Sequence, residues 1–72
     1  MSRAAEVDKI LKEKDAEKVL RGAYLLDPEI LLWLLKKDEK KFDKFTIKVA
    51  KLCKSNRKIV KKIREEYSNA RV

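Results

Sequence analysis

The fold is decided by residues 27–35, which read DPEILLWLL. Aspartate caps free amides at a helix start, proline suits the first helical position, and glutamate favours the positive end of the helix dipole. Because proline disfavours the helical conformation in the residue before it, the preceding helix must end near Leu26. The stretch therefore predicts one helix that begins at residue 28 and another that ends just before it.

Residues 30–35 are apolar on every side of the predicted helix. A helix of this kind is usually central, with neighbours on several sides. We expect these residues, including Trp33, to be buried in the core. The alternative is that one side remains exposed as a docking patch, with Trp33 as an anchor for a protein partner.

Two short helices are predicted on the N-terminal side of this stretch. The first starts after Ser2 and runs to about Lys14, with an apolar face at positions 7, 10 and 11. The next apolar set, at positions 16, 19, 20 and 23, is displaced by two residues, which is about 200° around a helix. One straight helix would point the two sets to opposite sides. We therefore expect a break between Glu13 and Ala16, with Asp15 as the N-cap.

The C-terminal side is predicted to be helical from Asp38 or Glu39 to about residue 68. Apolar faces lie at positions 42, 45, 49 and 52, and again at 59, 60, 63 and 67. Between them, Ser55-Asn56 has the composition of a turn and cap. The apolar phase continues through 55–56, so one long helix over 40–68, with Asn56 at a core position, is the alternative. Since helices of that length are uncommon, we favour two helices.

Composition supports an all-α fold. The chain has 72 residues, with one glycine and one proline, and it is rich in residues that favour helix. We expect a single helical domain over 1–72, built as a small bundle of four or five short helices. The surface is dominated by Lys and Glu, which is typical of proteins from hot environments.

The net charge of +8 is concentrated in one half of the chain. Residues 1–35 hold six basic and seven acidic residues, whereas residues 36–72 hold 14 basic and five acidic ones. In the first half, opposite charges alternate one helical turn apart, as in Asp8/Lys12, Lys9/Glu13 and Glu17/Arg21. In the second half, like charges meet at that spacing, and each such pair costs a helix about 0.2–0.5 kcal/mol.

The basic stretch predicts a nucleic-acid interface. A basic stripe along a helix is the electrostatic feature of a protein that binds DNA or RNA. At helical spacing, one side is expected to carry Lys44, Lys48, Lys51, Lys58 and Lys62. The candidate phosphate contacts are Lys44, Lys48, Lys51, Lys54, Arg57, Lys58, Lys61, Lys62 and Arg64. The alternatives are a face that only keeps the protein soluble, a surface for an acidic protein, or one for an anionic membrane.

The type of basic residue favours backbone contact over base reading. In residues 44–64, lysine outnumbers arginine by seven to two. Arginine reads guanine bidentately, while lysine acts more as a point charge. Asn56 is the one amide of this stretch that could read adenine. We therefore expect weak sequence preference.

Catalytic and metal chemistry are not predicted. The chain has no His and a single Cys, which excludes the usual zinc ligand sets, and no general base is paired with a nucleophile. We expect a non-enzyme without cofactor, and Cys53 as a buried thiol, with a reactive thiol as the alternative. The lone cysteine and the absence of an apolar export segment predict a cytoplasmic location.

The rival hypothesis is a protein-interaction module or small inhibitor that docks on an acidic partner. Residues 39–46, EKKFDKFT, have spacing similar to that of sliding-clamp ligands. They depart from that pattern at Glu39, Phe42 and Thr46, where the ligands have glutamine, an aliphatic residue and a second aromatic. In this hypothesis the anchors are Trp33, Phe42 and Phe45. A homodimer through the 42–67 face is compatible with either hypothesis.

Overall fold

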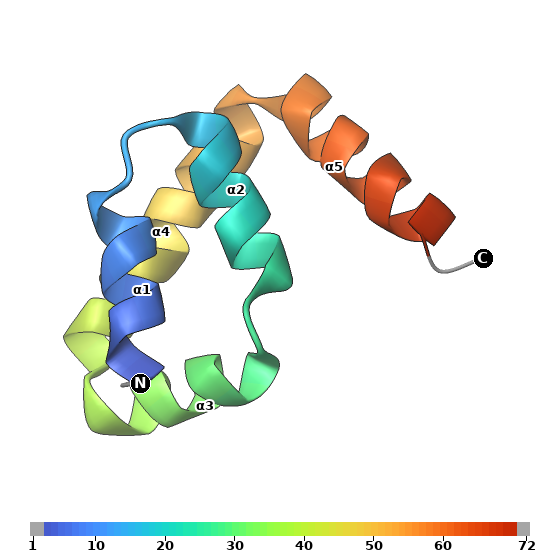
Figure 1. Ribbon diagram of the computed structural model, residues 1–72. Coiled ribbons are helices and arrows are strands. Elements are labelled where there is room, and N and C mark those ends of the chain that lie inside the picture. Colours follow the sequence, from blue (N-terminus) through green and yellow to red (C-terminus); the bar gives the residue numbers. More distant parts are fainter. Residues whose placement is uncertain (1–2, 71–72) are drawn as a thin grey trace.

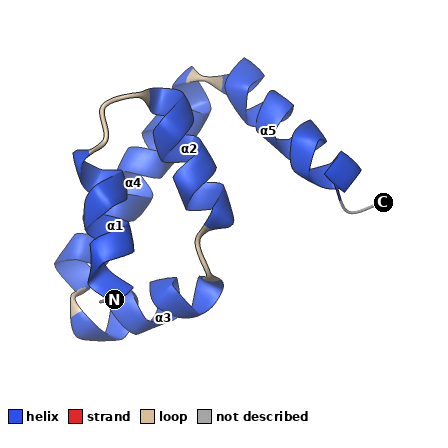
Figure 2. Cartoon of the chain, viewed as in Figure 1, coloured by secondary structure: helices blue, strands red, loops and turns tan. Residues whose placement is uncertain are grey.

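The computed structural model describes the backbone of residues 3–70, which forms five helices and, within that range, no strand (Figures 1 and 2). The prediction of a small all-α bundle is confirmed. The helices are α1 (Arg3–Lys12), α2 (Ala16–Leu25), α3 (Pro28–Lys37), α4 (Glu39–Ser55) and α5 (Arg57–Ala70). The first helix was predicted to start after Ser2, and α1 begins at Arg3.

Three helices begin on an aspartate, as the capping pattern predicts. Asp15, Asp27 and Asp38 accept hydrogen bonds from the backbone N–H groups of residues 17, 29 and 41, at 2.9, 3.0 and 3.1 Å. These bonds satisfy amides that have no partner inside the helix. The predicted break between α1 and α2 is confirmed, and the Glu13 carboxylate holds its turn by accepting from the N–H groups of residues 14 and 15.

The core is assembled from the first four helices. Its buried members are Val7 and Ile10 of α1, Val19 of α2, Leu34 of α3 and Phe45 of α4. Figure 1 shows α3 crossing the ends of the other helices, with α4 running beside α1 and α2. Each helix thus contributes one apolar face to a common centre, as the 3.6-residue periodicity requires.

Gly22 allows α1 and α2 to approach closely. A Cβ at this position would lie 3.1 Å from Ile10 Cγ1 and 3.3 Å from Ile10 Cδ1. A Cβ there would therefore require the Ile10 side chain to shift by a few tenths of an ångström. Glycine in a helix interior costs about 1 kcal/mol relative to alanine, and its missing Cβ is what permits this close approach.

The chain breaks between α4 and α5 at Asn56, which has φ −128° and ψ 51°. Its backbone N–H and its side-chain Nδ2 both donate to the Leu52 carbonyl, each at 2.9 Å. Both bonds close the end of α4, and α5 leaves in a new direction (Figure 1). The prediction of two helices is confirmed, and the alternative of one helix over 40–68 is wrong.

The fifth helix folds back over α2 and the end of α4. Ile63 is its buried residue, at 2% exposure, and the Tyr67 ring stacks on Tyr24 of α2 with centroids 4.9 Å apart. Arg21 of α2 donates to both oxygens of Glu66, at 2.7 and 3.3 Å. Apolar, aromatic and ionic contacts therefore all hold α5 to α2.

The expected burial of residues 30–35 is only partly correct. Leu34 is buried and Trp33 packs half-buried against the core, but Leu32 is 61% and Leu35 is 42% exposed. A bundle of this size places neighbours on one side of α3 only, so the opposite side meets solvent. None of the five described helices combines the length and the apolar composition that a bilayer span requires.

Candidate nucleic-acid interface

Eight of the nine predicted phosphate contacts are exposed side chains. They are Lys44, Lys51 and Lys54 of α4, and Arg57, Lys58, Lys61, Lys62 and Arg64 of α5. No acidic residue interrupts the chain between positions 44 and 64. Among the described side chains, the ion pairs are Arg21–Glu17, Arg21–Glu66 and Lys41–Asp8, so none uses a cation from this stretch.

Lys48 is the exception, because its ammonium group is used inside the fold. Its Nζ donates to the carbonyls of Ile10, Leu11 and Glu13, at 3.2, 2.7 and 2.8 Å. These carbonyls lie at the C-terminal end of α1, where backbone acceptors lack intrahelical partners and the dipole favours a cation. Lys48 therefore joins α4 to α1, and its three donors are already engaged.

The break at Asn56 divides the predicted basic stripe into two parts. Lys44 and Lys51 share the outer side of α4, whereas Lys58 and Lys62 belong to a helix with a different axis. The expected single side for positions 44, 48, 51, 58 and 62 required a continuous helix and is wrong. The cations instead form two basic helix faces that meet at the turn.

The turn itself concentrates positive charge at a helix N-terminus. Lys54, Arg57 and Lys58 line a shallow hollow of about 400 Å³ together with Ser55, Asn56 and Ile59. The first turn of α5 contains no acidic residue, in contrast to α2, α3 and α4. Cations near a helix N-terminus are repelled by the partial positive charge of the helix dipole. An anion bound there would relieve that repulsion.

Asn56 closes the end of α4 with its side chain. Its Nδ2 donates to the Leu52 carbonyl, and the residue is half-buried. Because an amide nitrogen carries two hydrogens, this bond alone does not exclude contact with a base, and weak sequence preference stays a prediction.

The ion pairs formed by Arg21 were predicted only in part. The Glu17–Arg21 pair was predicted from its spacing and is present at 3.1 Å. The bridge from Arg21 to Glu66 spans 45 residues, and sequence spacing carries no signal for it. Its hydrogen bonds raise the pKa of Arg21, while the bond from Arg21 is the main reason that the pKa of Glu66 is lowered. The charge of Lys62 lowers the Glu66 pKa further.

A second long-range ion pair ties α4 to α1. Lys41 Nζ lies 2.8 Å from Asp8 Oδ1, and this hydrogen bond raises the pKa of Lys41. The spacing of Asp8 had suggested Lys12 as its partner. Both Asp8 and Glu66 therefore neutralise cations within the scaffold, while residues 44–64 receive no such compensation from the ion pairs of the described part.

The predicted protein-interface anchors are largely used by the core. Phe45 is 3% exposed, and Phe42 and Trp33 are half-buried and packed against the core cluster. The sliding-clamp spacing at residues 39–46 thus coincides with the buried face of α4. The large apolar side chain that α4 exposes is instead Ile47, at 53%, which lies within one turn of Lys44 and Lys51.

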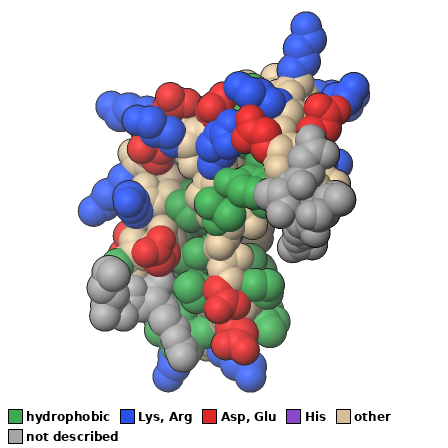
Figure 3. All heavy atoms as spheres, turned by 45° about the vertical axis from the view of Figure 1, so that its right-hand side comes forward, with side chains coloured by type: hydrophobic (Ala, Val, Ile, Leu, Met, Phe, Trp, Pro, Cys, Tyr) green, Lys and Arg blue, Asp and Glu red, His purple; other side chains and the backbone are tan. Residues whose placement is uncertain are grey.

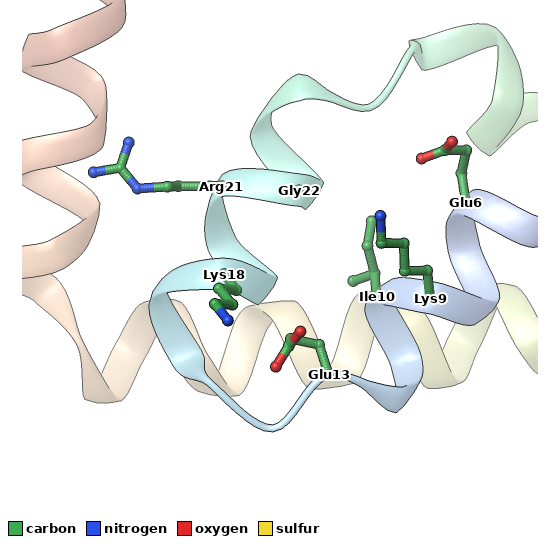
Figure 4. Close-up of a pocket in the computed structure, with 7 residues that line it drawn as sticks. All are labelled: Glu6, Lys9, Ile10, Glu13, Lys18, Arg21 and Gly22. Atoms are coloured by element: carbon green, nitrogen blue, oxygen red, sulfur yellow. The ribbon is translucent and has the colours of Figure 1, made fainter.

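A hollow of about 330 Å³ between α1 and α2 has no catalytic arrangement (Figure 4). Figure 4 shows Ile10 directed at Gly22 on its floor, with Glu13 at the α1 end and Arg21 turned away toward α5. Glu13 is engaged by backbone amides and Arg21 by two carboxylates. The remaining charged side chains of the lining are Glu6, Lys9 and Lys18, and the lining contains no Ser, Thr, Cys or His side chain.

Cys53 lines a smaller apolar hollow of about 180 Å³ beneath α5. Its thiol is half-buried rather than fully buried, beside Leu20, Val49 and Ile63. Among the described residues, no group of three His, Cys, Asp or Glu side chains is placed to hold a metal ion.

Comparison of this chain with protein-family models, with curated proteins and with solved structures finds no match.

Proposed function

We propose that this protein is a small non-enzymatic accessory protein that binds the backbone of DNA or RNA. The observation that carries the proposal is the group of eight exposed cations on α4 and α5, none of which forms an ion pair among the described side chains. The same fold pairs Arg21 and Lys41 with carboxylates. The eight exposed cations lie close together in sequence on two helices, with no acidic residue between positions 44 and 64, and this favours an external anion as their partner.

A polyanion suits this surface better than a single anion. The cations extend along two helices, and on α5 the pairs Arg57/Lys61 and Lys58/Lys62 are like charges one turn apart. Their mutual repulsion lowers the stability of that helix. Successive phosphates would neutralise several of them at once, and the release of condensed counterions would add to the affinity.

The test is binding to a mixed-sequence duplex and to a single strand by fluorescence anisotropy over a salt series. For five phosphate contacts on duplex DNA, the log of the association constant should fall against log salt with a slope of about −4.5. The decisive variant carries Lys44→Gln, Lys51→Gln, Lys58→Gln and Lys62→Gln. Lys48 is left unchanged because it supports the fold.

A matched variant separates a local interface from net charge. It carries Lys9→Gln, Lys12→Gln, Lys18→Gln and Lys37→Gln, which are four exposed lysines outside the basic stretch. For the variant at positions 44, 51, 58 and 62, we expect the slope of log association constant against log salt to become shallower by up to about 3.6. The matched variant should keep most of the wild-type slope. No binding at low salt, or equal losses in the two variants, would refute an interface at residues 44–64.

The second candidate function is docking on an acidic protein surface. Ile47 favours it, since an apolar side chain exposed among lysines suits a partner that offers both carboxylates and an apolar contact. Ile47→Ser should leave a phosphate-backbone interface almost unchanged. A strong loss of affinity for an acidic protein captured by the full chain, without loss of duplex binding, would favour this candidate.

A further inference from the structure

The outer side of α3 is an exposed surface that the nucleic-acid proposal does not use. At 100° per residue, positions 28, 29, 32, 35 and 36 share the side opposite the buried Leu34. All five are exposed, with Leu32 at 61% and Leu35 at 42%. Leu25, which is 64% exposed at the end of α2, adds apolar area close to the start of α3.

The charges on this side are ordered along the helix. Glu29 lies in the first turn of α3 and Lys36 in the last turn, with Leu32 near the midpoint between them. Figure 3 shows hydrophobic side chains gathered over the lower part of one face, with acidic side chains among them and basic ones at the lower edge. The surface is therefore apolar at its centre and carries opposite charges at its two ends.

We propose that α3 packs antiparallel against α3 of a second copy of this chain. A two-fold axis across the midpoint brings Leu32 of both copies together and reverses the direction of one helix. Positions 29 and 36 lie on the same lateral side of Leu32, so each Glu29 faces Lys36 of the other copy. Pro28 and Leu35 lie on the other lateral side and face each other across the axis in the same way.

Charge argues for a second copy over other occupants. A polyanion or an acidic protein would meet Asp27 and Glu29, and a basic partner would meet Lys36 and Lys37. A second copy matches both ends at once. Because residues 1–35 carry a net charge of only −1, with six basic and seven acidic residues, contact through this half keeps much of the repulsive charge away from the interface.

This surface differs from the 42–67 face, where the sequence placed a homodimer. Phe45 and Ile63 of that face are buried within one copy, at 3% and 2% exposure, so that face is already occupied. On the outer side of α3, Leu32 and Leu35 are instead 61% and 42% exposed, with no other described helix covering them. A contact of one ten-residue helix per copy lies at the lower end of interface sizes, so the dimer should dissociate on dilution.

The test is sedimentation equilibrium of the full chain over roughly 10 µM to 1 mM, a range set by weak interfaces of this size. We expect a reversible monomer–dimer equilibrium. Glu29→Lys or Lys36→Glu places like charges opposite each other twice per dimer, which should weaken association about tenfold. The double variant exchanges the charges and should recover most of the wild-type affinity.

The double variant also separates dimer contact from helix stability. It puts a lysine at the N-terminal end of α3 and a glutamate at the C-terminal end, which opposes the dipole in the monomer. Recovery of association therefore cannot come from a more stable helix. If a reversal unfolds the chain, Glu29→Gln and Lys36→Gln measure the same contact with smaller effects. A monomer at every concentration, or a double variant as weak as the single ones, would overturn the proposal.

Discussion

A lysine can present its charge to solvent or use it to join two elements of the fold. Lys48 joins α4 to α1. Its ammonium group donates to three carbonyls at the end of α1, 35 to 38 residues away in sequence. Lys51, one turn further along α4, is exposed and has no such role among the described contacts. Two lysines that look equivalent in the sequence thus perform different physical tasks.

Replacing Lys48 by methionine should destabilise the protein by about 1–3 kcal/mol, because it retains the apolar stem but leaves three carbonyls without their charged donor. The change should lower Tm by about 4–8 °C for each kcal/mol in a domain of this size. Lys51→Met is the control and should stay within about 0.5 kcal/mol of wild type. Thermal unfolding followed by circular dichroism measures both. A Lys48→Met protein that is stable but impaired in duplex binding would instead place Lys48 in the interface.

At the scale of elements, α5 is the helix least integrated into the bundle. The core cluster is drawn from α1 to α4, whereas α5 adds Ile63, the Tyr24–Tyr67 stack and the Arg21–Glu66 bridge. Five of the eight exposed cations of the proposed interface lie on this helix. Its attachment therefore determines how one basic face is held relative to the other.

Glu66→Gln should loosen α5 while leaving the core intact, since it removes the charge that Arg21 binds. Amide hydrogen exchange should become several-fold faster in α5 and remain unchanged in α1 to α4. Glu65→Gln is the control, because Glu65 is exposed and forms no ion pair among the described side chains. Equal effects of the two changes would show that the bridge does not hold α5.

The same bridge predicts a pH dependence. Arg21 lowers the pKa of Glu66 in the folded state. The stabilising effect of the bridge is therefore fully present at pH values above the pKa of Glu66 in the unfolded chain, about 4.3. The effect is lost as the pH falls through the lower pKa that Glu66 has in the folded state. Amide chemical shifts in α5, followed from neutral pH downward, should show this loss in wild type and not in Glu66→Gln. A wild-type α5 insensitive to acid would contradict the assignment.

At the scale of the whole molecule, self-repulsion opposes the compact state. The net charge is +8 on a body of 34 × 27 × 17 Å. The Debye length is about 30 Å at 0.01 M salt and about 10 Å at 0.1 M. At low salt, charges on opposite sides of the molecule therefore still repel one another. Because the core is formed by a few side chains from each helix, it contributes limited stability against this charge repulsion.

We therefore expect Tm to rise as NaCl increases from about 0.01 M to about 0.5 M, because screening weakens the repulsion more than it weakens the few exposed ion pairs. The variant with glutamine at positions 44, 51, 58 and 62 should start from a higher Tm at low salt and respond less. Thermal melts at matched buffer conditions measure the trend. A Tm that falls with salt would mean that attractive pairs dominate the electrostatics.

Local structure could be predicted from the sequence alone. The starts of α2, α3 and α4 follow from Asp15, Asp27-Pro28 and Asp38, because capping and proline geometry act over a few neighbouring residues. The faces of α1 and α4 follow from apolar spacing, since burial repeats with the helical turn. The concentration of cations in residues 44–64 is likewise a property of the chain itself.

Long-range relations were decided by the tertiary structure. The backbone angles at Asn56 set the direction of α5, the distance between α4 and α1 gave Lys48 its partners, and the position of neighbours left Leu32 exposed. Each depends on how helices distant in sequence meet. Capping and periodicity act within about one turn of the chain, whereas a side chain's burial and its distant partners depend on the surfaces that pack against it.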